Sequence, residues 1–191
     1  MSKQLKGVLI ALGVVLLVGF MTFSWVIKGY NAIIGLDENV KGKWAQVENQ
    51  LKRRYDLIPN LVETVKGYAS HEKELFKDIA EARTKYFQAQ DVKSKIGASN
   101  RLEGSLSRLL LLQERYPELK ANESFLKLQD SLEGTENRIS VERKRYNEAV
   151  QALNTYTRTF FGRFFAGIAG VASANYYEIP EGEKAVPKVK F

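Results

Sequence analysis

The chain has 191 residues, contains no cysteine and carries a formal net charge of +7. This length suits one ordinary folded domain plus an anchor, and the missing cysteine excludes disulfides, thiol catalysis and cysteine-ligated zinc. The basic excess is spread along the chain instead of gathered in one patch, so we expect no nucleic-acid binding.

The first element along the chain is an apolar run that we expect to span a membrane. Gly7 to Ile27 carry no charge, and a helix of this length, rising about 1.5 Å per residue, crosses the ~30 Å hydrocarbon core. Trp25 falls where interfacial aromatic residues belong, and Lys28 ends the run. A cleaved signal peptide or a buried core helix fits less well, because the run is long and ends in bulky residues. Lysines lie on both sides of it, which leaves the orientation open.

Residues 40–68 predict an amphipathic helix that packs against other helices. Its seam repeats every seven residues, the spacing of antiparallel bundles and coiled coils. The seam consists of Trp44, Leu51, Ile58 and Val65, and the rest of the stripe of Val40, Val47, Leu61 and Tyr68.

A proline interrupts this helix without interrupting its apolar stripe. Pro59 either kinks one continuous helix and frees the Tyr55 carbonyl, or lies in the first turn of a helix that restarts with Asp56 as its cap. Both alternatives bend the helix and keep the seam on one side.

Residues 71–116 carry two further apolar stripes, and the sequence leaves open whether they form one helix or two. The stripes are Leu75, Ile79, Ala82, Tyr86, Ala89 and Ile96, then Leu102, Leu106, Leu109 and Tyr116. The join at residues 90–100 holds Gly97 but no proline. Ser70 is expected to cap the start of this region, Pro117 to end it, and Asn122 to cap the next helix.

Residues 123–161 predict a second long helix, followed by an aromatic segment at 160–174. The seam of the helix is Phe125, Leu132, Ile139, Tyr146, Leu153 and Phe160. In the aromatic segment, Phe161, Phe164 and Phe165 fall on one side, so it could lie in a membrane interface, cap the bundle or contact another subunit. If residues 71–116 form two helices, the aromatic segment returns towards the lipid. If they form one helix, the segment lies far from the lipid.

Most of the chain outside the apolar run resembles the LemA family. The signature stretch at residues 30–72 is "YNAIIGLDENVKGKWAQVENQLKRRYDLIPNLVETVKGYASHE", and similarity continues in "EAR" at 81–83, "LSRLLLLQERYPELKANESFLKLQDSLEGTENRI" at 106–139, "RYNEAVQALN" at 145–154 and the terminal "PKVKF". One departure is Phe161, which stands where the family usually has proline.

The resemblance implies an N-terminal membrane anchor followed by an up-and-down helical bundle, and it implies no reaction and no cofactor. Some members of the family belong to magnetosome membrane formation. Genes of the family often neighbour those of membrane metalloproteases or other envelope proteins, which suggests partners of that kind.

The residues themselves also argue against catalysis. His71 is the only histidine, whereas a di-iron site in a bundle needs a Glu-x-x-His motif on each of two helices. No nucleophile elbow, dinucleotide loop or phosphate loop is present. We therefore expect no enzyme activity, no cofactor and no metal, with His71 facing solvent.

Two basic triplets are candidate contacts for a partner or for phospholipid. They are Lys52, Arg53 and Arg54, next to Pro59 and Asn60, and Arg143, Lys144 and Arg145. Most such runs are solvated helix faces, and Glu142 and Glu148 favour pairing within the helix around the second triplet.

The sequence as a whole predicts an all-α protein with an N-terminal transmembrane helix and an antiparallel up-and-down bundle of long, coiled-coil-like helices. We expect a polar N-terminus at 1–6, the anchor at 7–27, the bundle at 28–161, and the aromatic segment with a polar tail at 162–191. The expected function is that of a single-pass bacterial membrane protein that self-associates as a homo-oligomer and organises or shapes the envelope bilayer. The alternatives are an adaptor for an envelope partner such as a membrane metalloprotease, and a lipid-sensing module.

Overall fold

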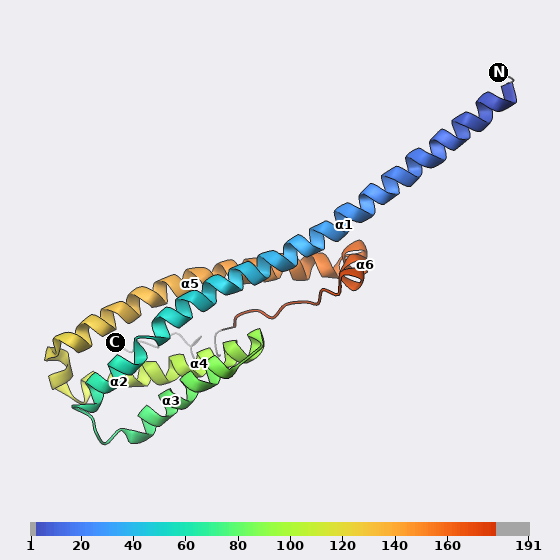
Figure 1. The fold of residues 1–191 in the computed structure, drawn as a ribbon. Coiled ribbons are helices and arrows are strands. Elements are labelled where there is room, and N and C mark those ends of the chain that lie inside the picture. Colours follow the sequence, from blue (N-terminus) through green and yellow to red (C-terminus); the bar gives the residue numbers. More distant parts are fainter. Residues whose placement is uncertain (1–2, 179–191) are drawn as a thin grey trace, which may run out of the picture. The chain divides into compact units, whose positions relative to one another are not determined.

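The computed structural model describes residues 3–178, and every regular element in that range is helical (Figure 1). The helices are α1 (Lys3–Tyr55), α2 (Ile58–Lys66), α3 (Lys73–Gln88), α4 (Val92–Leu110), α5 (Glu123–Arg158) and α6 (Phe160–Ala169), with 3₁₀ helices η1 (Leu111–Glu114) and η2 (Pro117–Ala121) between α4 and α5. This confirms the expected all-α class. Of the aromatic segment and polar tail predicted at 162–191, residues 179–191, including "PKVKF", lie outside the described residues.

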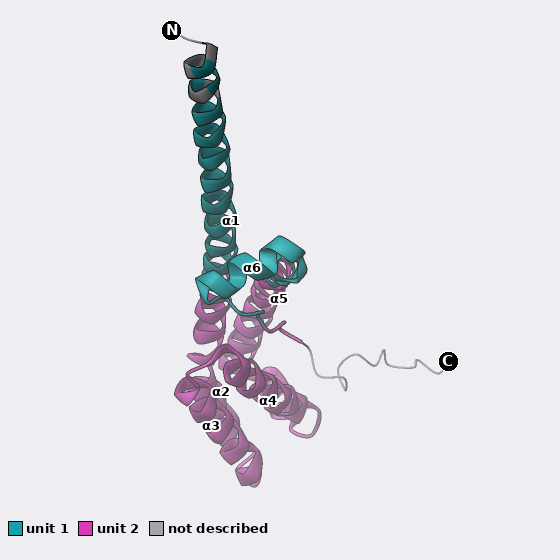
Figure 2. Cartoon of the chain, turned by 90° about the vertical axis from the view of Figure 1, so that its right-hand side faces the viewer, with its two compact units in different colours: residues 1–42, 149–174 teal, residues 43–148, 175–191 magenta. Residues whose placement is uncertain are grey.

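The chain divides into two compact units, coloured separately in Figure 2. Unit 1 consists of residues 1–42 with 149–174, and unit 2 of residues 43–148 with 175–191. Each of the two long helices, α1 and α5, therefore contributes one part to each unit.

Side-chain pairs in unit 2 show the up-and-down arrangement of its helices. The Trp44 ring lies 5.3 Å from the Tyr146 ring, and Arg54 pairs with Glu136, so α1 and α5 run in opposite directions. Lys95 in α4 pairs with Glu48 and Arg54 with Glu103, which makes α4 parallel to α1.

The heptad seam of α1 and α2 is buried along its whole length, from Trp44 to Val65. It crosses a short break at residues 56–57, where α2 restarts with Pro59 in its first turn and Leu57, without a side-chain bond, at the cap. The restarted helix is thus the correct alternative, but Asp56 is not its cap. The missing proline N–H leaves the Tyr55 carbonyl free, and Arg83 Nε donates to it over 3.2 Å.

Residues 71–116 form two helices, because the chain turns at residues 89–91. Asp91 caps α4 by accepting a hydrogen bond from the Ser94 amide over 2.9 Å, and this bond lowers the pKa of the Asp91 carboxyl. Gly97 lies inside α4. The chain therefore reverses at the turn that Asp91 caps, and not at Gly97.

Three predictions at helix ends are wrong. Ser70 does not cap α3, which begins at Lys73 after Glu72; the turn there is a tight one closed by backbone hydrogen bonds. Tyr68 is 43% exposed and Phe160 is 85% exposed, because each lies beyond the last buried position of its stripe. In contrast, Asn122 does cap α5, accepting from the Phe125 amide over 2.9 Å.

The end of α5 is sharp although Phe161 stands in the position usually taken by proline. Thr159 is extended and caps α6, its hydroxyl accepting from the Gly162 amide over 3.0 Å. A Cβ at Gly162 would overlap the Tyr156 carbonyl, so the turn needs glycine there. A cap and a glycine thus replace the proline as the device that separates α5 from α6.

After α6 the chain runs back in an extended segment at residues 171–178, begun by Gly170 in the left-handed conformation (φ 67°). In unit 1, Asn154 Nδ2 donates to the Ala174 carbonyl and Asn154 Oδ1 accepts from the Ala174 amide, both over 2.9 Å. In unit 2, Asn147 makes the same pair of bonds with Tyr177, over 3.0 and 2.8 Å. Two asparagines seven residues apart thus hold the backbone of this segment.

Candidate functional site

Unit 1 contains the apolar run of α1. The described chain has one helical segment long and apolar enough to cross a membrane, near the N-terminus, and its most apolar window has no buried residue. Trp25 and Ile27 at its end are 45% and 42% exposed, and Gly7 and Lys28 are also exposed. A helix that is apolar and uncovered by its own chain is typical of a membrane span.

Helix α6 packs against α1 at the point where this run ends. The Trp25 ring lies 4.9 Å from the Phe161 ring and 5.2 Å from the Phe165 ring, edge to face in both cases. The Phe165 ring rests directly on Gly29, where any Cβ would overlap it. Tyr156 OH donates to the Gly29 carbonyl over 3.2 Å. Glycine therefore permits the close approach of α6 to the α1 backbone.

The adjacent, outer side of α6 is apolar and uncovered. Phe161 is 55%, Phe164 56% and Ile168 57% exposed. An apolar groove beside them is lined by Trp25, Phe160, Phe161, Arg163 and Phe164. Phe165 alone among the three predicted phenylalanines faces inward, at 2% exposure.

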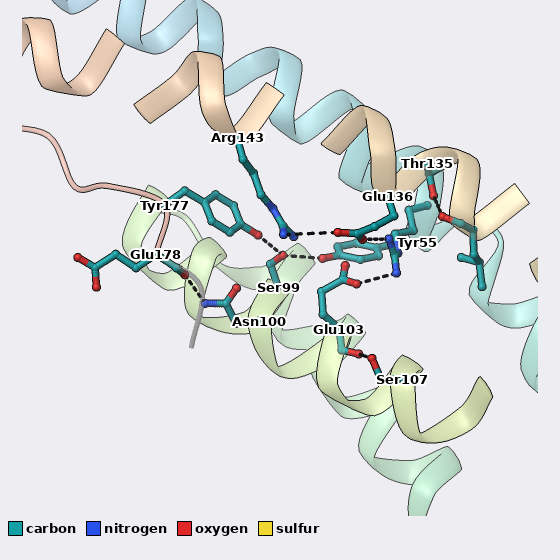
Figure 3. A network of polar contacts seen from close by, with 12 residues as sticks. Tyr55, Ser99, Asn100, Glu103, Ser107, Thr135, Glu136, Arg143, Tyr177 and Glu178 are labelled. Atoms are coloured by element: carbon teal, nitrogen blue, oxygen red, sulfur yellow. Dashed lines mark hydrogen bonds and ion pairs between the residues drawn. The ribbon is translucent and has the colours of Figure 1, made fainter. Parts of the chain in front are cut away.

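Unit 2 encloses a network of charged and phenolic side chains (Figure 3). Arg54, only 7% exposed, pairs with Glu103 over 2.8 Å and also with Glu136. Arg143 Nη1 lies 3.8 Å from Glu136, and its guanidinium lies over the Tyr177 ring, 4.5 Å from the centroid. In this cluster Arg54 and Arg143 thus pair with glutamates from α4 and α5.

A line of hydroxyl groups adjoins these charges. Tyr55 OH donates to Ser99 Oγ over 2.8 Å, and Ser99 Oγ lies 2.6 Å from Tyr177 OH. Burial raises the pKa of Tyr55 and of Tyr177, and it raises the pKa of Tyr146 to about 12. These phenols therefore stay protonated at neutral pH and serve as hydrogen-bond partners inside the bundle.

The structure separates the members of each basic triplet. Arg54 and Arg143 belong to the enclosed network, whereas Lys52, Arg53, Lys144 and Arg145 are exposed. Around the second triplet the predicted pairing within the helix is confirmed, since Arg145 lies 2.6 Å from Glu142 and Lys144 lies 4.0 Å from Glu148. Pro59 and Asn60 are exposed on α2.

His71 is exposed in the turn before α3, as expected. Within residues 3–178, no group of three or more histidine, aspartate or glutamate side chains is placed to hold a metal ion.

Several residues of these sites were not singled out from the sequence. Gly29, Asn147 and Asn154 are the clearest cases. The seven-residue spacing of the two asparagines, next to the apolar seam of α5, was a usable signal. Arg54 was singled out as a candidate contact in a basic triplet, and its buried position had a signal of its own, because it is the one gap in the apolar stripe of α1.

The LemA family model matches residues 43–191. The chain belongs to the LemA family. Two relatives, Magnetosome protein MamQ 1 and MamQ 2 of Paramagnetospirillum magneticum, are each 24% identical over 209 residues, covering 95% of this chain and 77% of theirs. Magnetosome protein MamQ of Magnetospirillum gryphiswaldense is 23% identical over 213 residues, covering 97% of this chain and 78% of its own. The apolar run of this LemA-family chain precedes the matched region. Family membership and the candidate span together indicate a membrane-associated structural protein.

Proposed function

We propose that this LemA-family chain is a single-pass, membrane-anchored structural protein of a bacterial membrane that self-associates in the plane of the bilayer and organises or shapes it. The observation that best supports anchoring and contact with the bilayer is the apolar surface of unit 1, which combines the run ending at Ile27 with the outer side of α6. Apolar surface of this extent on a folded chain is covered by lipid or by protein.

The enclosed groups of unit 2 support a structural role as well. The buried Arg54 and the partly buried Arg143 pair with glutamates, and the phenols are linked by hydrogen bonds. The proposal includes neither a cofactor nor a nucleic-acid partner. The likeness to proteins named for the magnetosome supports a role in a bacterial membrane assembly.

The proposal is tested by the mass of the full-length protein, measured by native mass spectrometry or light scattering after extraction in a mild detergent. A discrete homo-oligomer that persists on dilution is expected. A monomer with bound detergent at every concentration would contradict self-association and leave only the anchored bundle.

A second candidate function is that of an adaptor for an envelope protein such as a membrane metalloprotease. It is favoured by the exposed side of unit 2 that carries Lys52, Arg53, Pro59 and Asn60. A photoreactive residue at position 53 should then crosslink one other protein in cells.

A further inference from the structure

The outer side of α6 has an unusual composition for a surface exposed to water. Four large apolar side chains, Phe160, Phe161, Phe164 and Ile168, are each more than half exposed. The helix contains one charged residue, Arg163, and no acidic residue. Large apolar side chains along one side of a helix are what an interfacial helix buries in lipid, and Arg163 is the one cation that could meet the headgroups.

The position of α6 within unit 1 also suits a helix in a membrane interface. It contacts α1 at Trp25 and Gly29, on either side of Ile27, where the apolar run ends. If residues 7–27 fill the hydrocarbon core, Trp25 lies in the interfacial layer where tryptophans concentrate. Phe161, in edge-to-face contact with Trp25, then lies in the same layer.

The direction of α6 fits as well. Figure 2 shows α6 running across the unit 1 part of α1 instead of along it. A helix that crosses a span at its end can lie in the plane of the membrane, with one side in the lipid along its whole length. The contact of Phe165 with Gly29 holds it there.

We propose that α6 is an in-plane membrane helix whose Phe160, Phe161, Phe164 and Ile168 enter the leaflet in which the α1 span ends. This inference rests on the proposed membrane anchor. The occupant of the apolar groove beside Trp25 is acyl chain, and Arg163 meets the phosphate of an anionic headgroup. A second copy of α6 suits the surface less well, because the helix offers no carboxylate to pair with Arg163. By widening one leaflet, such a helix gives the chain a direct means of bending the bilayer.

The test uses the full-length chain, whose lack of cysteine allows single nitroxide labels. Labels are placed by Phe164→Cys and Ile168→Cys on α6, Leu16→Cys in the apolar run, and Val141→Cys, an exposed apolar position of α5 in unit 2. The protein is reconstituted in vesicles of phosphatidylethanolamine and phosphatidylglycerol, diluted until most vesicles hold one chain. The ratio of collision rates with oxygen and with a water-soluble nickel chelate is then measured for each label.

The proposal predicts a ratio several-fold higher at positions 164 and 168 than at 141, and approaching that at 16. Equal ratios at 164, 168 and 141, with a high ratio at 16, would overturn the in-plane helix and leave the anchor intact. Low ratios at all four positions would instead contradict the anchor itself. Protection of 164 that occurs only at high protein density, together with spin–spin broadening, would assign the surface to a second copy and overturn the lipid assignment.

Discussion

The two units use the same two long helices in opposite ways. In unit 2, α1 and α5 bury their apolar seams and even enclose charged residues, so that Arg54 is 7% exposed. In unit 1, the remaining parts of α1 and α5 join α6, and large apolar side chains such as Phe164 point outward. The heptad pattern predicts which side of a helix packs against protein. The composition of the remaining sides indicates what surrounds them: they are charged in unit 2 and apolar in unit 1.

The largest loss of stability should follow removal of the charge buried in unit 2. Arg54→Ala removes the guanidinium that lies 2.8 Å from the Glu103 carboxylate, and breaking such a buried pair costs about 3–5 kcal/mol. The free energy of unfolding is measured by urea titration in detergent, with Trp44 as the fluorophore in a Trp25→Phe background. The matched control Arg53→Ala, at an exposed position of the same triplet, should change it by less than about 0.5 kcal/mol. Equal effects would show that Arg54 acts as a surface residue.

A smaller effect is expected where α6 meets α1. Gly29→Ala places a Cβ in the space of the Phe165 ring, and overpacking of this kind costs about 1–3 kcal/mol. The Trp25 fluorescence in a Trp44→Phe background should shift as its contacts with Phe161 and Phe165 loosen.

Gly35→Ala is the matched control for that change, because a Cβ at Gly35 meets nothing within 4 Å. Its spectrum should equal that of the parent. A Gly29→Ala protein with an unchanged spectrum would show that α6 does not depend on this close approach.

The extended segment at 171–178 should respond more weakly. Asn147→Ala deletes two hydrogen bonds to the Tyr177 backbone, worth about 1–2 kcal/mol together. Amide exchange at Tyr177 should become faster, whereas Asn60→Ala, at an exposed position on α2, should leave it unchanged. Continued slow exchange in Asn147→Ala would mean that other contacts hold the segment.

The last prediction concerns the free energy of unfolding in alkaline solution; at neutral pH no change is expected. Burial raises the pKa of Tyr146 to about 12, compared with about 10 for an unfolded chain. Between these values the unfolded state releases the proton first, so the free energy of unfolding falls as the pH rises through that range. Urea titrations at successive pH values should show this fall, and Tyr146→Phe should reduce its slope. An identical slope in Tyr146→Phe would remove Tyr146 as its source.

The sequence allowed the fold to be predicted well where apolar residues repeat. The seams of α1, α2 and α5 were placed correctly except at their ends, Tyr68 and Phe160, because burial in a bundle depends on spacing along the helix. Helix ends were harder: Asp91 and Thr159 act through single side-chain bonds to amides three residues on, and many polar residues could do the same.

The sites were less accessible to prediction because they depend on pairing between distant segments. The partnership of Arg54 with Glu103 and Glu136 joins three helices, and no local pattern identifies those partners. The inward position of Phe165 likewise depends on Gly29, far away in the chain. Phe164 and Phe165 are neighbours in the sequence, and only the folded structure distinguishes the exposed one from the buried one.

Under the proposed function, residues 7–27 remain part of the protein as a membrane span. The most direct test is the intact mass of the chain recovered from bacterial membranes after washing in alkaline carbonate. The protein should stay in the washed membranes with a mass that includes residues 7–27. Release into the carbonate wash, or a mass that lacks the apolar run, would contradict it.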